Sequence, residues 1–178
     1  MANMNNMGQF SGDMDRNEVE IDLNKFMALL QEKSELKDRI RELEDINNDF
    51  DWIVSSGPTP SSGTGPNSAY EGLEYIYTEA SNPNNPSKIA SLISPCFNLS
   101  EYDNPVLHFW FHKYGNGQGS LAVDISTNNG ATWNWNHWDV YGNLGDQWNQ
   151  IAIDLSMFNS SEVLIRLRVI TGNNFKSD

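Results

Sequence analysis

Residues 106–126 decide the fold: Val-Leu-His-Phe-Trp-Phe-His-Lys-Tyr-Gly-Asn-Gly-Gln-Gly-Ser-Leu-Ala-Val-Asp-Ile-Ser. Apolar side chains recur at every second position in two runs, Leu107–Phe111 and Leu121–Ile125. This is the period of β-strands that bury one face. The glycine-rich segment Gly115–Gly119 between the runs supplies the backbone freedom that a turn needs. The stretch therefore predicts two antiparallel strands with a shared buried face.

The same period continues through the chain beyond residue 49. Further runs with apolar residues at alternate positions are Leu73–Tyr77, Ile151–Leu155 and Val163–Val169. Segments such as Asn129-Gly130 lie between the runs and favour turns. Because no helical pattern separates the runs, we expect antiparallel pairing. The sequence predicts a mainly β sandwich domain over residues 49–178.

The segment before this domain has a different period. Residues 1–17 show no periodicity, and we expect a flexible N-terminus there. Residues 18–48 contain no Pro or Gly and are rich in good helix formers. Leu29, Leu36 and Leu43 repeat every seven residues at position d of a heptad, which places Phe26, Lys33, Ile40 and Asn47 at position a of a coiled-coil seam. This pattern predicts a coiled-coil α-helix in front of the β domain.

The helix is expected to gather copies of the chain into a dimer or a trimer. In a parallel assembly, Arg39 would face Glu44 of a neighbouring helix with opposite charge. The alternative is an amphipathic helix that lies on its own domain, because three heptads alone are marginal. The residues expected at the interface are Phe26, Leu29, Leu36, Arg39, Ile40, Leu43 and Glu44.

Composition excludes several classes of partner. The net charge is −13, and both the helical segment and the β domain are acidic, so nucleic acid and anionic membrane surfaces would be repelled. No run of about 18 apolar residues predicts insertion into a membrane. Cys96 is the single cysteine, which excludes an internal disulfide. No secretory signal is visible at the N-terminus.

Several segments of the β domain resemble the MAM domain found in meprins, neuropilins and receptor tyrosine phosphatases. The opening resemblance lies in Asp49-Phe50-Asp51-Trp52 and the Ser/Gly/Pro-rich residues 56–66 that follow. The resemblance continues, in order along the chain, through Tyr75–Ser81, Ile93–Pro95, Leu107–Gly115, Gly142–Trp148 and Arg168–Asp178.

This resemblance implies a jelly-roll, concanavalin-like sandwich at the cell surface or outside the cell. The low cysteine content is similar to that of bacterial or phage members. The first and last strands of the family lack a match in the sequence, so we expect the domain to be a fragment or to be completed by another chain. A virion surface is the alternative location.

Acidic residues near the opening segment are candidates for a structural cation. Calcium prefers carboxylate and carbonyl oxygens, and the resemblance implies a calcium or sodium ion near that segment. The competing interpretation is that these carboxylates cap turns. The candidate ligands are Asp49, Asp51, Glu79 and Asp178, and no other cofactor is expected.

Aromatic residues between positions 133 and 141 are candidates for ligand contact. An exposed aromatic ring can stack on a sugar ring. Trp133, Trp138 and Trp148 coincide with core aromatics of the family, so packing is the competing interpretation for this cluster. The candidate contact residues are Trp135, His137 and Tyr141.

We expect a non-enzymatic recognition and adhesion module. No nucleophile elbow, phosphate-binding loop or zinc-protease motif is present in the sequence. Multiple copies joined by the helix would raise the apparent affinity for a cell-surface protein or glycan. The alternatives are a fibre or appendage subunit of a virion and a carbohydrate-binding accessory domain.

Overall fold

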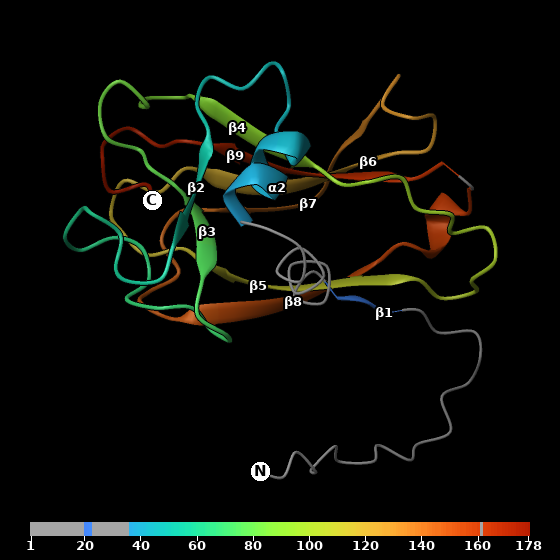
Figure 1. Cartoon of the computed structure of the whole chain (residues 1–178), viewed down its shortest axis with the longest axis horizontal. Helices are drawn as coiled ribbons and strands as arrows, with labels where there is room; N and C mark the ends of the chain where they lie inside the picture. Colours follow the sequence, from blue (N-terminus) through green and yellow to red (C-terminus); the bar gives the residue numbers. More distant parts are fainter. Residues whose placement is uncertain (1–19, 23–35, 161) are drawn as a thin grey trace, which may run out of the picture.

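The computed structural model describes residues 20–22, 36–160 and 162–178 (Figure 1). In chain order, the described elements are β1 (Glu20–Asp22), α2 (Leu36–Leu43), β2 (Trp52–Ser55), β3 (Tyr75–Thr78), β4 (Ile89–Ile93), β5 (Val106–His112), β6 (Ser120–Ser126), β7 (Asn134–Tyr141), β8 (Trp148–Asp154), the short 3-10 helix η1 (Ser156–Phe158) and β9 (Leu164–Ile170). Within this part of the chain, no helix has the length and apolar character needed to cross a membrane.

Two sheets face each other across one core. The larger sheet has the order β4-β9-β6-β7 and is antiparallel throughout, and the smaller has the order β1-β5-β8. Strand β5 alternates as its sequence predicted, with Leu107, Phe109 and Phe111 buried. Leu121, Val123 and Ile125 of β6 and Leu167 of β9 pack against the same core. The mainly β, antiparallel prediction is confirmed.

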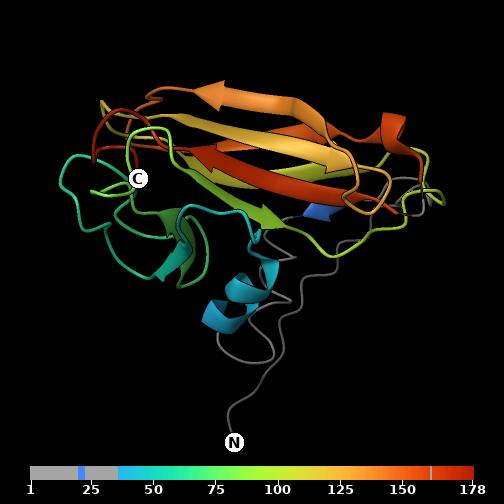
Figure 2. The same ribbon diagram turned by 90° about the horizontal axis from the view of Figure 1, so that it is seen from above.

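The antiparallel pair β2–β3 and helix α2 lie together on one side of the sandwich, as Figures 1 and 2 both show. The buried face of α2 is centred on Ile40, which is 2% exposed and packs with Leu92 of β4. Leu43, Trp52 and Val54 pack against the same small cluster. The apolar face of α2 therefore packs on its own domain. This is the second of the two arrangements considered for the helix, the first being a coiled-coil interface between chains.

The structure differs from the continuous helix expected over residues 18–48. Glu20–Asp22 pair in parallel with Val106–His108 as a short strand, and α2 covers Leu36–Leu43. After α2, the chain bonds to the edge of β4 through Asp45 N to Ser91 O and Asp49 N to Ile89 O. These bonds replace the next helical turn. Phe26 and Leu29 of the expected seam lie outside the described residues.

Candidate functional site

The outer face of the larger sheet carries an aromatic platform, which we define as Trp133, Trp135, Arg166 and Arg168. The guanidinium of Arg166 lies 4.2 Å from the ring centre of Trp133 and 4.3 Å from that of Trp135. Arg168 lies 4.8 Å from the Trp135 ring. Both arginines are buried, whereas Trp135 is 59% exposed. The cations hold one face of Trp135, so its indole is presented to solvent in a fixed orientation.

A buried carboxylate holds the two arginines in place. The carboxylate of Asp124, which is fully buried, accepts hydrogen bonds from Nε of Arg168 at 2.7 Å and Nε of Arg166 at 3.0 Å. Nη2 of Arg166 is also 2.9 Å from the same oxygen, a charge contact that lacks hydrogen-bond alignment. Burial alone would raise the pKa of Asp124, but the bonds from Arg168, the Asn136 amide and Arg166 lower it below the usual value. Asp124 therefore stays charged and neutralises one arginine.

Strand register places these groups together. Asp124 of β6 pairs directly with Arg166 of β9, so their side chains share the outer face. A shift in the β6–β7 register, between Val123 and Ile125, brings the Asn136 amide within 2.8 Å of Asp124 Oδ1. Asn136 adopts a φ of 53°, a conformation that asparagine tolerates better than most residues. This bulge also turns the neighbouring Trp135 over the arginines.

The three predicted ligand residues do not form one site. Trp135 stands on the platform, and Tyr141 is 65% exposed at the other end of β7. Six residues of extended strand separate them by about 20 Å. His137 is turned away, with Nε2 3.1 Å from the Asp154 carbonyl oxygen and its ring edge-on to Phe158. Trp135 and Tyr141 both remain exposed aromatic rings, and of the two Trp135 is the one held by arginine contacts.

The four predicted cation ligands divide into separate places. Asp49 accepts a hydrogen bond from the Ile89 amide at 2.8 Å and lies 3.3 Å from Lys88 Nζ, which is a capping role. The Asp51 carboxylate neighbours that of Glu44 instead. Within residues 20–22, 36–160 and 162–178, no group of three or more His, Cys, Asp or Glu residues is placed to hold a metal ion.

Glu79 and Asp178 lie close together although they are far apart in the sequence. The amide of Ala80, which follows Glu79 and precedes Asp178 by 98 positions, donates to Asp178 Oδ1 at 3.0 Å. Burial, with the nearby Glu79 carboxylate, raises the pKa of Asp178 to about 7. One oxygen of each carboxylate, Glu79 Oε2 and Asp178 Oδ2, is buried without a hydrogen-bond partner. The fold thus brings two of the four predicted ligands, Glu79 and Asp178, close together.

Sequence reasoning missed a second aromatic group, on the outer face of the smaller sheet. Tyr70 stacks on Trp110 of β5 with ring centres 3.7 Å apart and planes 16° from parallel. Trp148 of β8 lies edge-on to Tyr70 at 6.5 Å and donates from Nε1 to the Ser68 carbonyl oxygen. Tyr70 belongs to a loop without periodicity, so no local signal in the sequence pointed to this contact.

Comparisons with known proteins agree with this architecture. Residues 42–178 match the family model described as MAM domain, meprin/A5/mu. MAM domain-containing glycosylphosphatidylinositol anchor protein 1 of Rattus norvegicus is 30% identical over 120 residues, which cover 64% of this chain and 12% of that protein. Neuropilin-1 of Xenopus laevis is 31% identical over 112 residues, which cover 62% of this chain and 11% of that protein.

The matched region is thus a small part of these much longer relatives, but the family model spans most of the chain, including both sheets from β4 onward and the β2–β3 pair. The chain belongs to the MAM domain family.

Proposed function

We propose that this chain is a non-enzymatic recognition module, of the extracellular adhesion type, that contacts its partner through the aromatic platform. The observation that carries the proposal is the exposed indole of Trp135, which is held from below by Arg166 and Arg168. A rigid aromatic ring loses little conformational entropy when a ligand stacks on it. The proteins similar to this chain include a glycosylphosphatidylinositol anchor protein, which supports a cell-surface or extracellular location. We expect the strand connections to follow the jelly-roll order.

The ligand that suits this platform best is a neutral glycan. Asn134 and Asn136 are exposed on either side of Trp135; Asn134 offers its whole amide group to sugar hydroxyls, whereas Asn136 offers only its amide N–H groups, because its Oδ1 accepts a hydrogen bond from Arg168 Nη2. The chain carries a net charge of −13, which disfavours sialylated or sulfated sugars. The two platform arginines do not offset this charge, because Asp124 binds both and Asp45 lies 3.8 Å from Arg166.

The test is binding of the full chain to an array of neutral and anionic glycans and to whole cells, with Trp135→Ala compared with Met157→Ala. Met157 is 71% exposed and lies outside the platform, so it controls for loss of exposed apolar surface. Loss of one stacking ring should weaken binding about 10-fold or more, whereas Met157→Ala should bind as wild type. Equal binding by both variants would refute the platform as the contact surface.

We also propose that Glu79 and Asp178 bind a structural calcium or sodium ion. Their two buried, unpartnered carboxylate oxygens support this, because paired carboxylates are stable when a cation lies between them. Calcium should raise the melting temperature of the wild-type chain at pH 7.5, and Glu79→Gln should abolish that rise. Asp49→Asn should keep it, since Asp49 caps Ile89. An equal response of all three proteins, or none in wild type, would contradict the site.

Self-association through the N-terminal segment is a further proposal. Leu29 and Leu36 lie seven residues apart and Phe26 lies three residues before Leu29, which is the a/d spacing of a coiled coil and supports the proposal. Ile40 packs within its own domain, so the seam would have to lie ahead of that residue. Light scattering of the full chain and of a Phe26→Ser/Leu29→Ser variant distinguishes a dimer or trimer from a monomer. A monomeric wild-type chain would end this proposal.

A further inference from the structure

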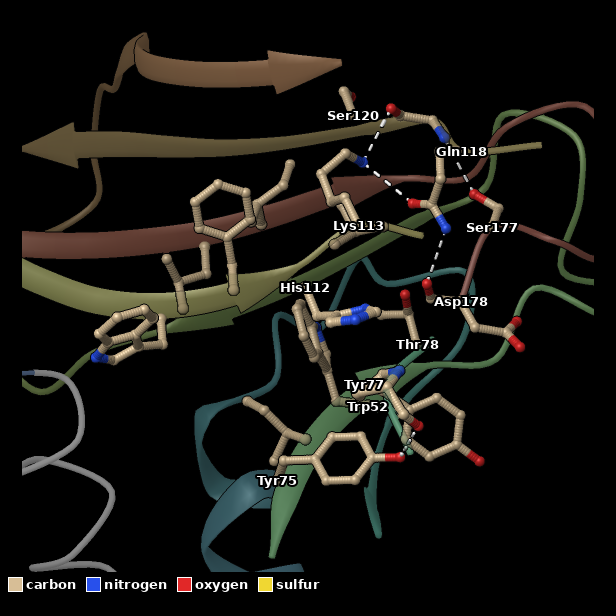
Figure 3. Close-up of a pocket in the computed structure, with 18 of the residues that line it drawn as sticks. Trp52, Tyr75, Tyr77, Thr78, His112, Lys113, Gln118, Ser120, Ser177 and Asp178 are labelled. Atoms are coloured by element: carbon tan, nitrogen blue, oxygen red, sulfur yellow. Dashed lines mark hydrogen bonds between the residues drawn. The ribbon is translucent and has the colours of Figure 1, made fainter. Parts of the chain in front are cut away.

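A cavity of about 120 Å³ lies between the β2–β3 pair, strand β5 and the C-terminal segment (Figure 3). Its walls are mainly aromatic and aliphatic. They include Trp52 of β2, Tyr75 and Tyr77 of β3, Phe109 and Phe111 of β5, and Trp148 of β8. Cavities of roughly 150 Å³ with apolar walls accommodate a molecule the size of benzene. This cavity therefore suits a compact ligand close to benzene in size.

Three buried polar atoms on these walls have no hydrogen-bond partner: Trp52 Nε1, His112 Nδ1 and Asp178 Oδ2. Trp52 Nε1 carries a hydrogen that meets no acceptor, and His112 Nδ1 meets no donor or acceptor. The His112 side chain is 4% exposed, so bulk water does not satisfy it. A buried polar group without a hydrogen bond costs about 1–3 kcal/mol. Asp178 Oδ2 belongs to the carboxyl that neighbours Glu79, so Trp52 Nε1 and His112 Nδ1 are the two atoms left for a ligand with matching polar atoms.

The protonation of His112 defines what the ligand must offer. Nε2 lies 3.2 Å from Asp146 Oδ1, so this nitrogen carries the hydrogen and donates to the carboxylate. Burial lowers the pKa of His112, which favours the neutral ring. Nδ1 of neutral His112 is then a bare acceptor, while Trp52 Nε1 is a donor. A hydroxyl group can serve both, because it accepts and donates.

We propose that this cavity binds a small neutral molecule that carries a hydroxyl group on a compact apolar ring, with Trp52 and His112 as its polar contacts. A cationic ligand is disfavoured because the buried ammonium of Lys113 lies on the same walls, bonded to Gln118 Oε1 and the Gly119 carbonyl oxygen. Asp178 also lines the cavity, but its Oδ1 accepts from the Ala80 amide, and its unpaired Oδ2 is assigned, with Glu79, to the metal ion proposed above rather than to the organic ligand. The site is separate from the platform, which lies on the opposite face of the larger sheet.

The experiment uses the full chain with phenol as the probe and benzene as the matched compound without a hydroxyl. Calorimetry should show saturable phenol binding that is at least about 10-fold tighter than benzene binding, because benzene leaves both polar atoms unpaired. Trp52→Phe keeps an aromatic wall but removes the donor, and should weaken phenol binding about 2- to 12-fold. Tyr141→Phe, which removes a hydroxyl from an exposed ring outside the cavity, should bind phenol as wild type does.

Two further readouts keep the test independent of variant folding. In wild type, phenol should move the proton resonance of the Trp52 indole N–H downfield, as a new hydrogen bond does, and by more than benzene, which acts only through its ring current. Phenol affinity should fall at acidic pH, where protonated His112 Nδ1 becomes a donor. Absence of saturable phenol binding would mean that ordered water alone satisfies the two atoms, and would overturn the proposal. Equal affinity for phenol and benzene, or a Trp52 indole N–H shift with phenol no larger than that with benzene, would overturn it as well.

Discussion

Lys113→Met should change how the stability of this protein depends on pH. Lys113 is 5% exposed, and its ammonium donates to Gln118 Oε1 at 3.2 Å and to the Gly119 carbonyl oxygen at 3.1 Å. Neither acceptor carries a full charge. Burial therefore lowers the pKa of Lys113 from 10.5 to about 8. The folded protein holds a charged lysine at neutral pH at a cost in free energy.

The size of this cost follows from the shift in pKa. The drop from 10.5 to about 8 corresponds to about 3 kcal/mol of destabilisation at neutral pH, at about 1.4 kcal/mol per unit. Below pH 8 both the folded and the unfolded chain hold the proton, so the full cost is present. Between pH 8 and 10.5 the unfolded chain binds the proton more strongly, so stability rises with pH. About 2 kcal/mol of the cost should disappear between pH 7 and 9.5.

Urea unfolding at pH 7, 8, 9 and 9.5, at constant ionic strength, measures this effect. The free energy of unfolding of wild type relative to Lys113→Met should increase by about 2 kcal/mol across the series. Lys88→Met is the control, because the Lys88 side chain is 43% exposed, and its difference from wild type should stay within about 0.5 kcal/mol. A difference between wild type and Lys113→Met that is constant with pH would refute the reasoning.

Two other substitutions test the packing of the helix and the base of the platform. Ile40→Ala should lower the free energy of unfolding by about 2–5 kcal/mol in urea titrations, because it opens a cavity beneath α2. The control is Arg41→Ala on the exposed side of the helix, which should change the free energy of unfolding by less than about 0.5 kcal/mol. Stability of Ile40→Ala equal to wild type would mean that α2 does not rest on the domain. Asp124→Asn should cost about 3–5 kcal/mol in the same assay, because it leaves Arg166 and Arg168 buried without their shared carboxylate. A loss below about 1 kcal/mol would show that the arginines find water or another partner.

Strand positions could be predicted because alternation is a local property. Leu107, Phe109 and Phe111 share a face in any extended chain, so their burial followed from spacing alone. The partner of a helix is not local. The spacing of Ile40 and Leu43 suits a seam between chains as well as a contact with Leu92, and only the fold places Leu92 beneath Ile40.

The candidate sites depended still more on long-range pairing. The register between β6 and β9 brings Asp124 beside Arg166, and the bulge at Asn136 sends Trp135 outward while His137 turns toward Asp154. The bulge interrupts the alternation of side chains along the strand, so the directions of Trp135 and His137 did not follow from their spacing.

The sequence by itself determined the β architecture, the acidic charge and the family resemblance, because period, composition and local motifs are readable along the chain. Only the tertiary structure decided which polar groups meet. It joins Glu79 to Asp178 and leaves Asp49 as a cap, and it buries Lys113 and His112 beside one cavity. The physical reason is that contacts between distant residues are set by the packing of whole sheets, which no short stretch of sequence encodes.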